Sequence, residues 1–267
     1  MELMSKLTAI RFVVAMAAGL ALAACSGTMP SEDVGNFQDL EDVGDYGEVQ
    51  EGHIVIPRVD PQYLQEPNRR TSVAYNGYET PGTIVVDPYA KFLYYVEAPG
   101  AAIRYPIAAG REGRGFQGEA TVGRMAEWPG WTPTANMIRS EPDVYGPFSK
   151  GIPGGRANPL GARAIYLYRG NRDTYYRIHG TNDPATIGNS GSAGCIRLFN
   201  QDAIDLYNRV SVGSTVVVRT YEESVAIEGY DMANRGQEMA PRHVDPAEVY
   251  AAVAEDQRRK AEYEAGF

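Results

Sequence analysis

The chain has 267 residues, of which 43% are hydrophobic, so it can hold one large domain or two small ones. Its 29 glycines and 18 tyrosines are typical of a β-rich fold with many loops. The formal net charge of −9 is uneven: residues 26–51 carry only acidic charges, whereas residues 52–220 have a net charge of +4, from 18 Lys and Arg against 14 Asp and Glu. This weakly basic middle suits a substrate with free carboxylates and argues against nucleic acid as a partner.

The first 25 residues have the pattern of an export signal. Lys6 and Arg11 precede the apolar run 12–22, which is too short to span a bilayer comfortably. The run closes with Leu-Ala-Ala-Cys at 22–25, which resembles the lipobox of bacterial lipoproteins and would make Cys25 a lipidated N-terminus. The alternative is an ordinary signal peptide cleaved near Ala24. We expect a lipid-anchored periplasmic protein, held by the outer rather than the inner membrane because Ser26 follows the cysteine.

Residues 26–70 are acidic at first, then interrupted by prolines, and show little hydrophobic periodicity. We predict a flexible tether that holds the following domain away from the membrane.

From residue 71 the sequence predicts strands. Runs at 83–87 and 91–97 flank a turn signal at 88–90, and a third run covers 102–109. Residues 111–156 form a long Gly- and Pro-rich segment without regular pattern, which is typical of a lid or binding wall. Within it, Trp128 and Trp131 either line a substrate cleft or pack the segment against the sheet.

The pattern becomes regular again after residue 160. Runs at 163–168 and 174–179 predict a hairpin, residues 200–210 a helix with Asn200 as its N-cap, and residues 214–219 a buried last strand. Residues 221–267 are acidic, and Asp-Pro at 245–246 opens a predicted helix through Tyr263.

The loop between His179 and Cys195 is the candidate catalytic centre. A cysteine is a good nucleophile only as its thiolate, so it needs a base or cation nearby, and His179 can act as that base. Gly194 lets successive backbone N–H groups face one point, as an oxyanion hole requires. Arg197 places a positive charge two residues beyond the thiol, where it can bind a carboxylate.

These residues carry a family resemblance. His179-Gly180, followed by Ser192-x-Gly194-Cys195-Ile196-Arg197 and Asn200, resembles the signature of the L,D-transpeptidases, the YkuD domain. Segments 158–164 and 104–110 are also similar to Gram-negative members. The resemblance covers about residues 71–220 and implies a mainly β catalytic domain, a β-sandwich or barrel with one short helix after the catalytic loop. The acidic tail 221–267, partly helical, follows it.

The resemblance also implies roles for individual residues. Cys195 would attack the tetrapeptide stem of peptidoglycan and release D-alanine, with His179 as general base and acid and the Gly180 carbonyl orienting its ring. The N–H groups of Gly194 and Cys195 would form the oxyanion hole. Ser192, Arg197 and Asn200 would support the loop or bind the stem. Many family members carry His or Arg where this chain has Ala193, so activation would rest more heavily on His179.

The sequence does not decide which group accepts the acyl group from Cys195. An amine on another stem or on an outer-membrane protein would make the chain a transpeptidase, and water would make it a carboxypeptidase or endopeptidase. A third reading is a wall-binding lipoprotein with a silent thiol. We expect no metal, because one His and one Cys sixteen positions later do not make a zinc site. We expect no cofactor, because no phosphate-binding loop precedes a Lys-Ser/Thr pair and no dinucleotide fingerprint follows a strand.

Overall fold

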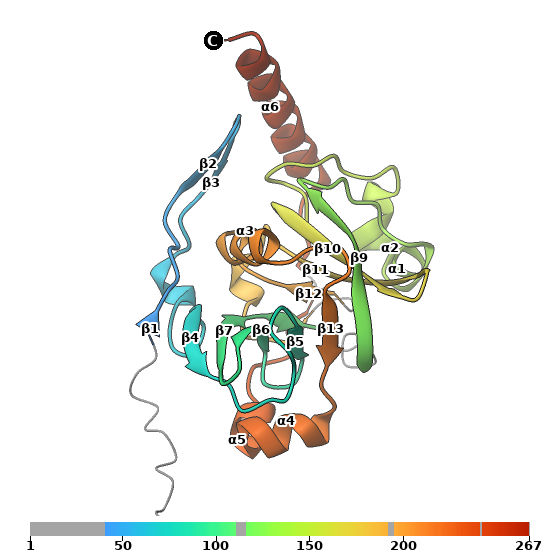
Figure 1. The fold of residues 1–267 in the computed structure, drawn as a ribbon. Helices are drawn as coiled ribbons and strands as arrows, with labels where there is room; N and C mark the ends of the chain where they lie inside the picture. The colour runs from blue at the N-terminus through green and yellow to red at the C-terminus, as the bar shows by residue number, and fades with distance from the viewer. Residues whose placement is uncertain (1–40, 111–115, 192–194, 241, 267) are drawn as a thin grey trace, which may run out of the picture. The chain divides into compact units, whose positions relative to one another are not determined.

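The computed structural model describes residues 41–110, 116–191, 195–240 and 242–266 (Figure 1). These residues belong to one compact unit, residues 39–267. The predicted export signal, the lipidation site at Cys25, and the site residues Ser192 and Gly194 lie outside the described residues, so those predictions stay predictions.

The described chain is mainly β, as predicted, and most of its strands form one mixed sheet. In sheet order these are β1 (Glu41–Asp42), β4 (Thr71–Ala74), β7 (Ala101–Pro106), β6 (Phe92–Ala98), β5 (Ile84–Asp87), β13 (Thr215–Val218), β9 (Gly118–Glu127), β10 (Arg163–Arg169), β11 (Arg172–His179), β12 (Ile196–Arg197) and β8 (Ala108–Ala109). The pairs β5–β13 and β11–β12 are parallel, and the other pairs are antiparallel.

The sheet buries side chains on both faces in its middle. In β5, Ile84 and Val86 join the main core, while Val85 between them joins a second cluster with Phe92 and Tyr94 of β6. The alternation follows from the two-residue period of a strand. The main core takes residues from β7 at one end of the sheet and from β12 at the other, so the sheet curls around it.

Strand β9 is the largest difference from the sequence prediction. The segment 111–156 shows no regular pattern in sequence, yet Gly118–Glu127 forms a ten-residue strand between β13 and β10. Only Ala120 and Val122 of this strand are fully buried, so its sequence lacks the apolar alternation that identifies a strand.

The helices lie mostly in the second half of the chain. They are α1 (Ala135–Ser140), α2 (Pro142–Tyr145), α3 (Asn200–Arg209), α4 (Tyr221–Glu228), α5 (Tyr230–Ala233) and α6 (Pro246–Glu264), with 3₁₀ turns at Pro61–Tyr63, Gly146–Phe148 and Pro184–Thr186. The predicted helices after the catalytic loop and in the tail are both present. Asp245 caps α6 by accepting from the Ala247 N–H, as the Asp-Pro signal predicts. None of the helices in the described ranges is both long and apolar enough to cross a bilayer.

The described part of the predicted tether differs from the prediction. Residues 41–70 contribute β1 to the sheet and form a separate hairpin, β2 (Val49–Glu51) and β3 (Ile54–Ile56). The Tyr46 hydroxyl donates to Asp202 of α3 at 3.2 Å, and Gln201 donates to the Pro57 carbonyl at 3.0 Å. These polar contacts do not appear as hydrophobic periodicity, so a pattern search does not find them.

The C-terminal helices dock on the domain through ion pairs. Arg219 lies between Asp87 of β5 at 3.3 Å and Glu228 of α4 at 2.7 Å, and Ser224 also donates to Asp87. In α6, Asp256 accepts from the Arg156 side chain at 2.6 Å. The tail is therefore attached both to the sheet and to the Gly- and Pro-rich segment.

Candidate active site

His179 is the last residue of β11 and is only 4% exposed. Its Nδ1 lies 2.6 Å from the Gly180 carbonyl oxygen. A carbonyl oxygen can only accept, so Nδ1 carries the proton of the neutral ring and Nε2 keeps a lone pair. The ring is thus held in the tautomer that a general base needs.

The charge of His179 is set by its surroundings. Burial, reinforced by the positive charges of Arg197 and Arg177, lowers the pKa of His179 to about 3, against upward contributions from hydrogen bonds to the backbone of Gly180 and Leu160. The imidazole is therefore neutral throughout the physiological range. A neutral ring can take a proton from a thiol, whereas an imidazolium could only act as its counterion.

The backbone register brings Cys195 beside His179. Strand β12 lies between β11 and β8, with Ile196 opposite Ile178 and Arg197 opposite His179. Ile196 enters the core, so Arg197 and His179 face the other side of the sheet. Cys195 immediately precedes β12, and continuing the same alternation by one residue assigns it to the side of Arg197 and His179. Cys195 is a half-buried thiol at this position. The residues that the sequence selects as nucleophile and base thus lie on adjacent backbone segments, Cys195 just before β12 and His179 at the end of β11.

Asn200 has a different role from the predicted helix cap. The N-cap of α3 is Phe199, and Asn200 is the first helical residue. The Asn200 side chain accepts from the N–H groups of Ala162 at 2.9 Å and Thr181 at 3.2 Å, and donates to the Thr181 carbonyl at 2.9 Å. Asn200 therefore fastens the backbone that follows His179 to the backbone that precedes β10.

This contact explains two glycines. A Cβ atom on Gly180 would lie 2.1 Å from the Asn200 Oδ1, and one on Gly161 would lie 2.2 Å from the same atom. Gly161 also has a φ of +61°, which favours glycine. Gly180 thus allows Asn200 to approach the carbonyl that orients His179.

The Arg197 side chain is partly buried and interacts electrostatically with other residues of the site. Burial lowers its pKa, and the opposing upward contributions come from Cys195, Asp183 and Tyr145. A guanidinium keeps its charge at physiological pH even so. Arg197 therefore supplies a fixed positive charge that interacts electrostatically with the Cys195 thiol, with Asp183 in the loop and with Tyr145 in α2.

The tryptophans of the long segment have separate surroundings. The Trp128 indole N–H donates to Glu51 at 3.0 Å, and Glu51 also accepts from Arg163 at 2.9 Å. Trp131 forms a backbone bridge with Ile152, and its ring lies 6.3 Å from that of Tyr145. Trp128 thus both packs and lines a cavity, and Trp131 packs within the segment.

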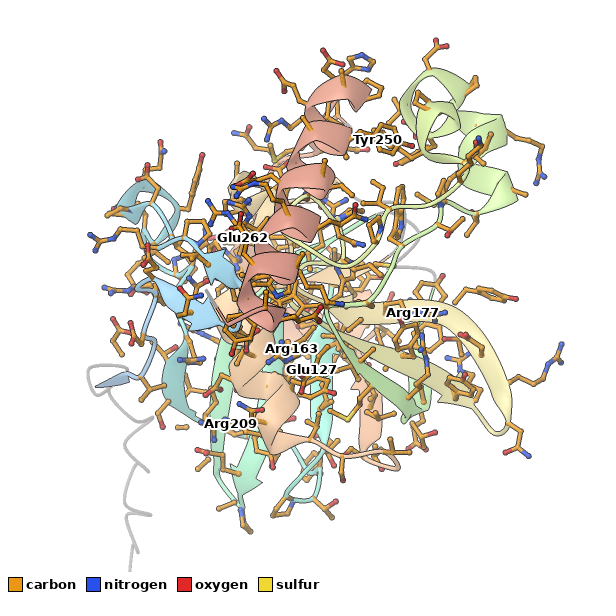
Figure 2. The ribbon with its side chains drawn as sticks, turned by 90° about the horizontal axis from the view of Figure 1, so that it is seen from above. Glu127, Arg163, Arg177, Arg209, Tyr250 and Glu262 are labelled. Atoms are coloured by element: carbon orange, nitrogen blue, oxygen red, sulfur yellow. The ribbon has the colours of Figure 1, made fainter. Side chains whose placement is uncertain are left out.

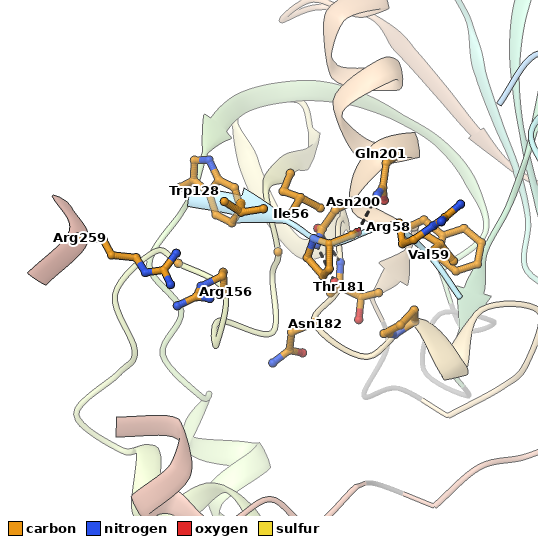
Figure 3. A pocket seen from close by; sticks show the side chains of 16 residues that line it. Ile56, Arg58, Val59, Trp128, Arg156, Thr181, Asn182, Asn200, Gln201 and Arg259 are labelled. Atoms are coloured by element: carbon orange, nitrogen blue, oxygen red, sulfur yellow. Dashed lines mark hydrogen bonds between the residues drawn. The ribbon is translucent and has the colours of Figure 1, made fainter. Parts of the chain in front are cut away.

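The cavity lined by Trp128 has a volume of about 420 Å³ (Figure 3). Val55 and Ile56 of β3, Thr181 and Asn200 contribute to it, and Arg156 and Arg259 line one side, with Arg58 opposite. Its described lining includes neither His179 nor Cys195. The cavity lies behind the Asn200 contact rather than at the thiol.

The sequence analysis missed the contact between the C-terminal segment and the catalytic loop. The Ser190 N–H donates to the Gln237 carbonyl at 2.8 Å, and the Gln237 N–H donates to the Asn189 side chain at 3.0 Å. Glu238 forms a parallel bridge with Ser190. These are mostly backbone contacts in a polar stretch, and no residue pattern identifies them.

The sequence also contains a glycine pattern that bears on cofactor binding. Gly113, Gly115 and Gly118 have the spacing of a dinucleotide fingerprint and follow the predicted strand run 102–109, so the expectation that no such fingerprint follows a strand is wrong. The fingerprint requires a helix next, and Gly118 instead begins β9. Within the residues that the structure describes, no group of three His, Cys, Asp or Glu side chains is placed to hold a metal ion.

Half of the chain matches a known protein family. The family of the L,D-transpeptidase catalytic domain (YkuD) matches residues 81–218, which is half of the chain. The chain belongs to this family. The matched range contains His179, Cys195, Arg197 and Asn200, and the α4–α6 region lies outside it.

Individual relatives match a stretch of similar length. The chain is 34% identical over 137 residues to the probable L,D-transpeptidase YbiS of Escherichia coli K12, and 38% identical over 138 residues to the probable L,D-transpeptidase ErfK/SrfK of the same strain. Each match covers 51% of this chain and 43% of the relative, so it spans less than half of those proteins. A crystal structure described as a probable carnitine operon oxidoreductase from Brucella melitensis is 52% identical, covers 59% of this chain and 98% of its own, and has a TM-score of 0.41.

Proposed function

We propose that this protein is a peptidoglycan L,D-transpeptidase that works through an acyl-enzyme on Cys195. The observation that carries the proposal is the tautomer of His179. With Nδ1–H held by the Gly180 carbonyl, Nε2 keeps a lone pair, and the strand next to β11 begins directly after Cys195. Family membership supplies the substrate class, the tetrapeptide stem.

The proposed reaction has two halves. In the first, Nε2 of His179 takes the proton of the thiol as Sγ attacks the carbonyl that precedes the terminal D-alanine. The C–N bond breaks, the proton passes to the leaving amine, and a thioester remains on Cys195. In the second, a neutral amine attacks the thioester carbonyl and gives a proton to His179 as the new C–N bond forms. The C–S bond breaks, and the proton returns from His179 to Sγ, which regenerates the thiol.

Several groups stabilise the charges that develop. The backbone N–H groups of Gly194 and Cys195 are our proposed oxyanion hole. Arg197 supplies positive charge to the thiolate, and this is the compensation we propose for Ala193. A neutral His179 cannot supply that charge itself, so the arginine acts in place of an imidazolium.

The acceptor and the location belong to the same proposal. An amine on a second stem gives a cross-link, and an amine on an outer-membrane protein ties that protein to the wall. Lipidation at Cys25 would keep the enzyme in the periplasm at the outer membrane, within reach of both. With Cys25 alkylated, Cys195 is the only thiol of the mature chain.

The test is a product assay on the chain from Ser26 to Phe267, which keeps β1, Tyr46 and the β2–β3 hairpin, purified and verified as folded by circular dichroism. It is incubated with disaccharide-tetrapeptide, with Cys195→Ala as control, and products are read by mass spectrometry. A cross-linked dimer that has lost one D-alanine, absent in the control, supports transpeptidation. Tripeptide alone makes the enzyme a hydrolase. Unchanged substrate with an unmodified Cys195 contradicts both and favours a wall-binding role.

A further inference from the structure

A row of side chains crosses the sheet from β9 to the catalytic thiol. Arg124 of β9 is opposite Tyr166 of β10, and Tyr166 is opposite Arg177 of β11. The next strand is β12, where Ile196 is opposite Ile178, so Cys195 continues the row beyond Arg177. The row therefore ends at the nucleophile.

The members of the row face the catalytic side of the sheet. Their neighbours Ile165, Ile178 and Ile196 belong to the main core. Because successive side chains point to opposite faces, Arg124, Tyr166 and Arg177 point away from that core. His179 and Arg197, the next opposed pair on β11 and β12 with the same orientation, point away from it too. The row is thus part of the same surface as the catalytic residues.

The arginines of the row stack on one aromatic ring. The Arg124 guanidinium carbon lies 3.6 Å from the centre of the Tyr166 ring, and that of Arg177 lies 4.4 Å from it. Figure 2 shows Arg177 over the β10–β11 hairpin. Stacking fixes each guanidinium by its flat face and leaves its in-plane N–H groups to bind a carboxylate.

The row carries more positive than negative charge. Arg177 forms a bidentate pair with Asp173, at 2.7 and 2.8 Å. The positive charge of Arg124 also acts on Asp173 electrostatically, and Arg124 is exposed to solvent. A second carboxylate supplied by a ligand would complete the charge balance.

An exposed aromatic side chain stands beside the row. Tyr175 is 75% exposed and has a φ of +63°, which costs a non-glycine residue about 1–2 kcal/mol. The hydrogen bond from its N–H to Asp173, at 2.8 Å, helps to hold this conformation. Its ring lies 5.9 Å from the Arg177 guanidinium, so the strained residue adds an apolar surface next to the two charges.

We infer that Arg124, Tyr166, Arg177 and Tyr175, here called the arginine–tyrosine strip, bind a free carboxylate of the donor stem peptide. The inference rests on the proposed function, which supplies the peptide. Two strand spacings separate Cys195 from β10, roughly 10 Å. An extended residue spans about 3.5 Å, so the bound carboxylate lies up to three residues from the attacked carbonyl. Tyr175 covers the apolar part of the same peptide.

The experiment pairs a variant with a matched substrate. Transfer is measured with tetrapeptide stems whose glutamyl carboxylate is free or amidated, and with a third stem amidated at the diamino acid. We expect Arg124→Gln to raise KM about tenfold for the stem that keeps the recognised carboxylate, with kcat unchanged. It should leave the KM of the stem lacking that carboxylate unchanged. Arg124→Lys should retain most of the affinity.

Control variants separate a loss of carboxylate binding from a general loss of activity. Arg172→Gln removes an exposed arginine from the same hairpin and should change neither KM. Equal effects of Arg124→Gln on all three stems, or no effect on any, would overturn the inference. If no transfer occurs at all, binding of the same stems to Cys195→Ser is measured by calorimetry. A carboxylate preference that Arg124→Gln removes would support the strip even when the proposed reaction fails.

Discussion

The two ends of the loop between His179 and Cys195 are fixed by different means. At the first end, the imidazole is buried, and the Asn200 side chain holds the backbone that follows it against the backbone that precedes β10. At the second end, Cys195 is half-buried and its direction follows from the two-residue strand β12 between β11 and β8.

The difference separates two tasks. The base must keep one tautomer, which a short hydrogen bond to a firmly held carbonyl provides. The nucleophile must face the base and still reach a substrate, which strand register provides without burying the thiol. Substitutions at the first end should therefore change the protonation state of His179 and lower kcat. Substitutions at the second end should change the reactivity of the Cys195 thiol itself.

The largest effect is expected at the reacting atoms. Cys195→Ala should abolish transfer, and His179→Gln should reduce kcat by about a thousandfold or more, since it removes the proton acceptor. Both are measured by release of D-alanine from tetrapeptide. His179→Gln should still react slowly with iodoacetamide at high pH, because its thiol remains. Normal transfer by His179→Gln would show that another group is the base.

A smaller effect is expected at Asn200, which acts through the backbone. Asn200→Ala removes three hydrogen bonds and should lower kcat about 10- to 100-fold, while the unfolding free energy falls by about 2 kcal/mol. Asn200→Asp keeps the acceptor for both N–H groups and should retain more activity. The matched control is Asn182→Ala, an exposed neighbour in the loop. The readouts are kcat at several pH values and urea unfolding. Equal activity of the Ala and Asp variants would contradict the role of Oδ1.

The pH dependence tests the state of the base. Since the folded pKa of His179 is about 3, the base is already neutral at pH 5, and kcat/KM should show no inflection from imidazole near pH 6.5. The unfolded chain takes up this proton near pH 6.5, so folding stability should fall as the pH drops from there towards 3. Rate profiles of the native chain and of Asn200→Ala are compared. An acid limb near pH 6.5 in the native chain would contradict the buried neutral base.

The smallest effect is expected at Asp202 of α3, which changes the pH dependence of folding stability. Burial raises the pKa of Asp202 to about 7, despite Arg70 at 3.4 Å. The folded state therefore keeps a proton that the unfolded chain loses near pH 4, so this group lowers stability as the pH rises from 4 to 7. Asp202→Asn should flatten that dependence, by about 1–3 kcal/mol, in urea unfolding at pH 5 and pH 8. An unchanged pH dependence would contradict the raised pKa.

The sequence predicts the parts of the fold that rest on apolar periodicity. The hairpins β5–β6 and β10–β11, the helix α3 and the tail helix α6 are all where the pattern places them. Strand β9 and the ordered segment 41–70 were missed, because their contacts are polar or shared between backbones. In the site, His179 and Cys195 follow from the motif. The Asn200 contact does not, since it joins backbone positions 38 and 19 residues away.

The most direct test of the account is the covalent state of Cys195 during turnover. The chain is mixed with disaccharide-tetrapeptide in the absence of acceptor, quenched in acid within seconds, digested, and examined by mass spectrometry. The account predicts that the peptide containing Cys195 carries the stem without its terminal D-alanine. D-alanine release by the native chain with Cys195 unmodified at every time point, together with equal release by Cys195→Ala, would contradict it.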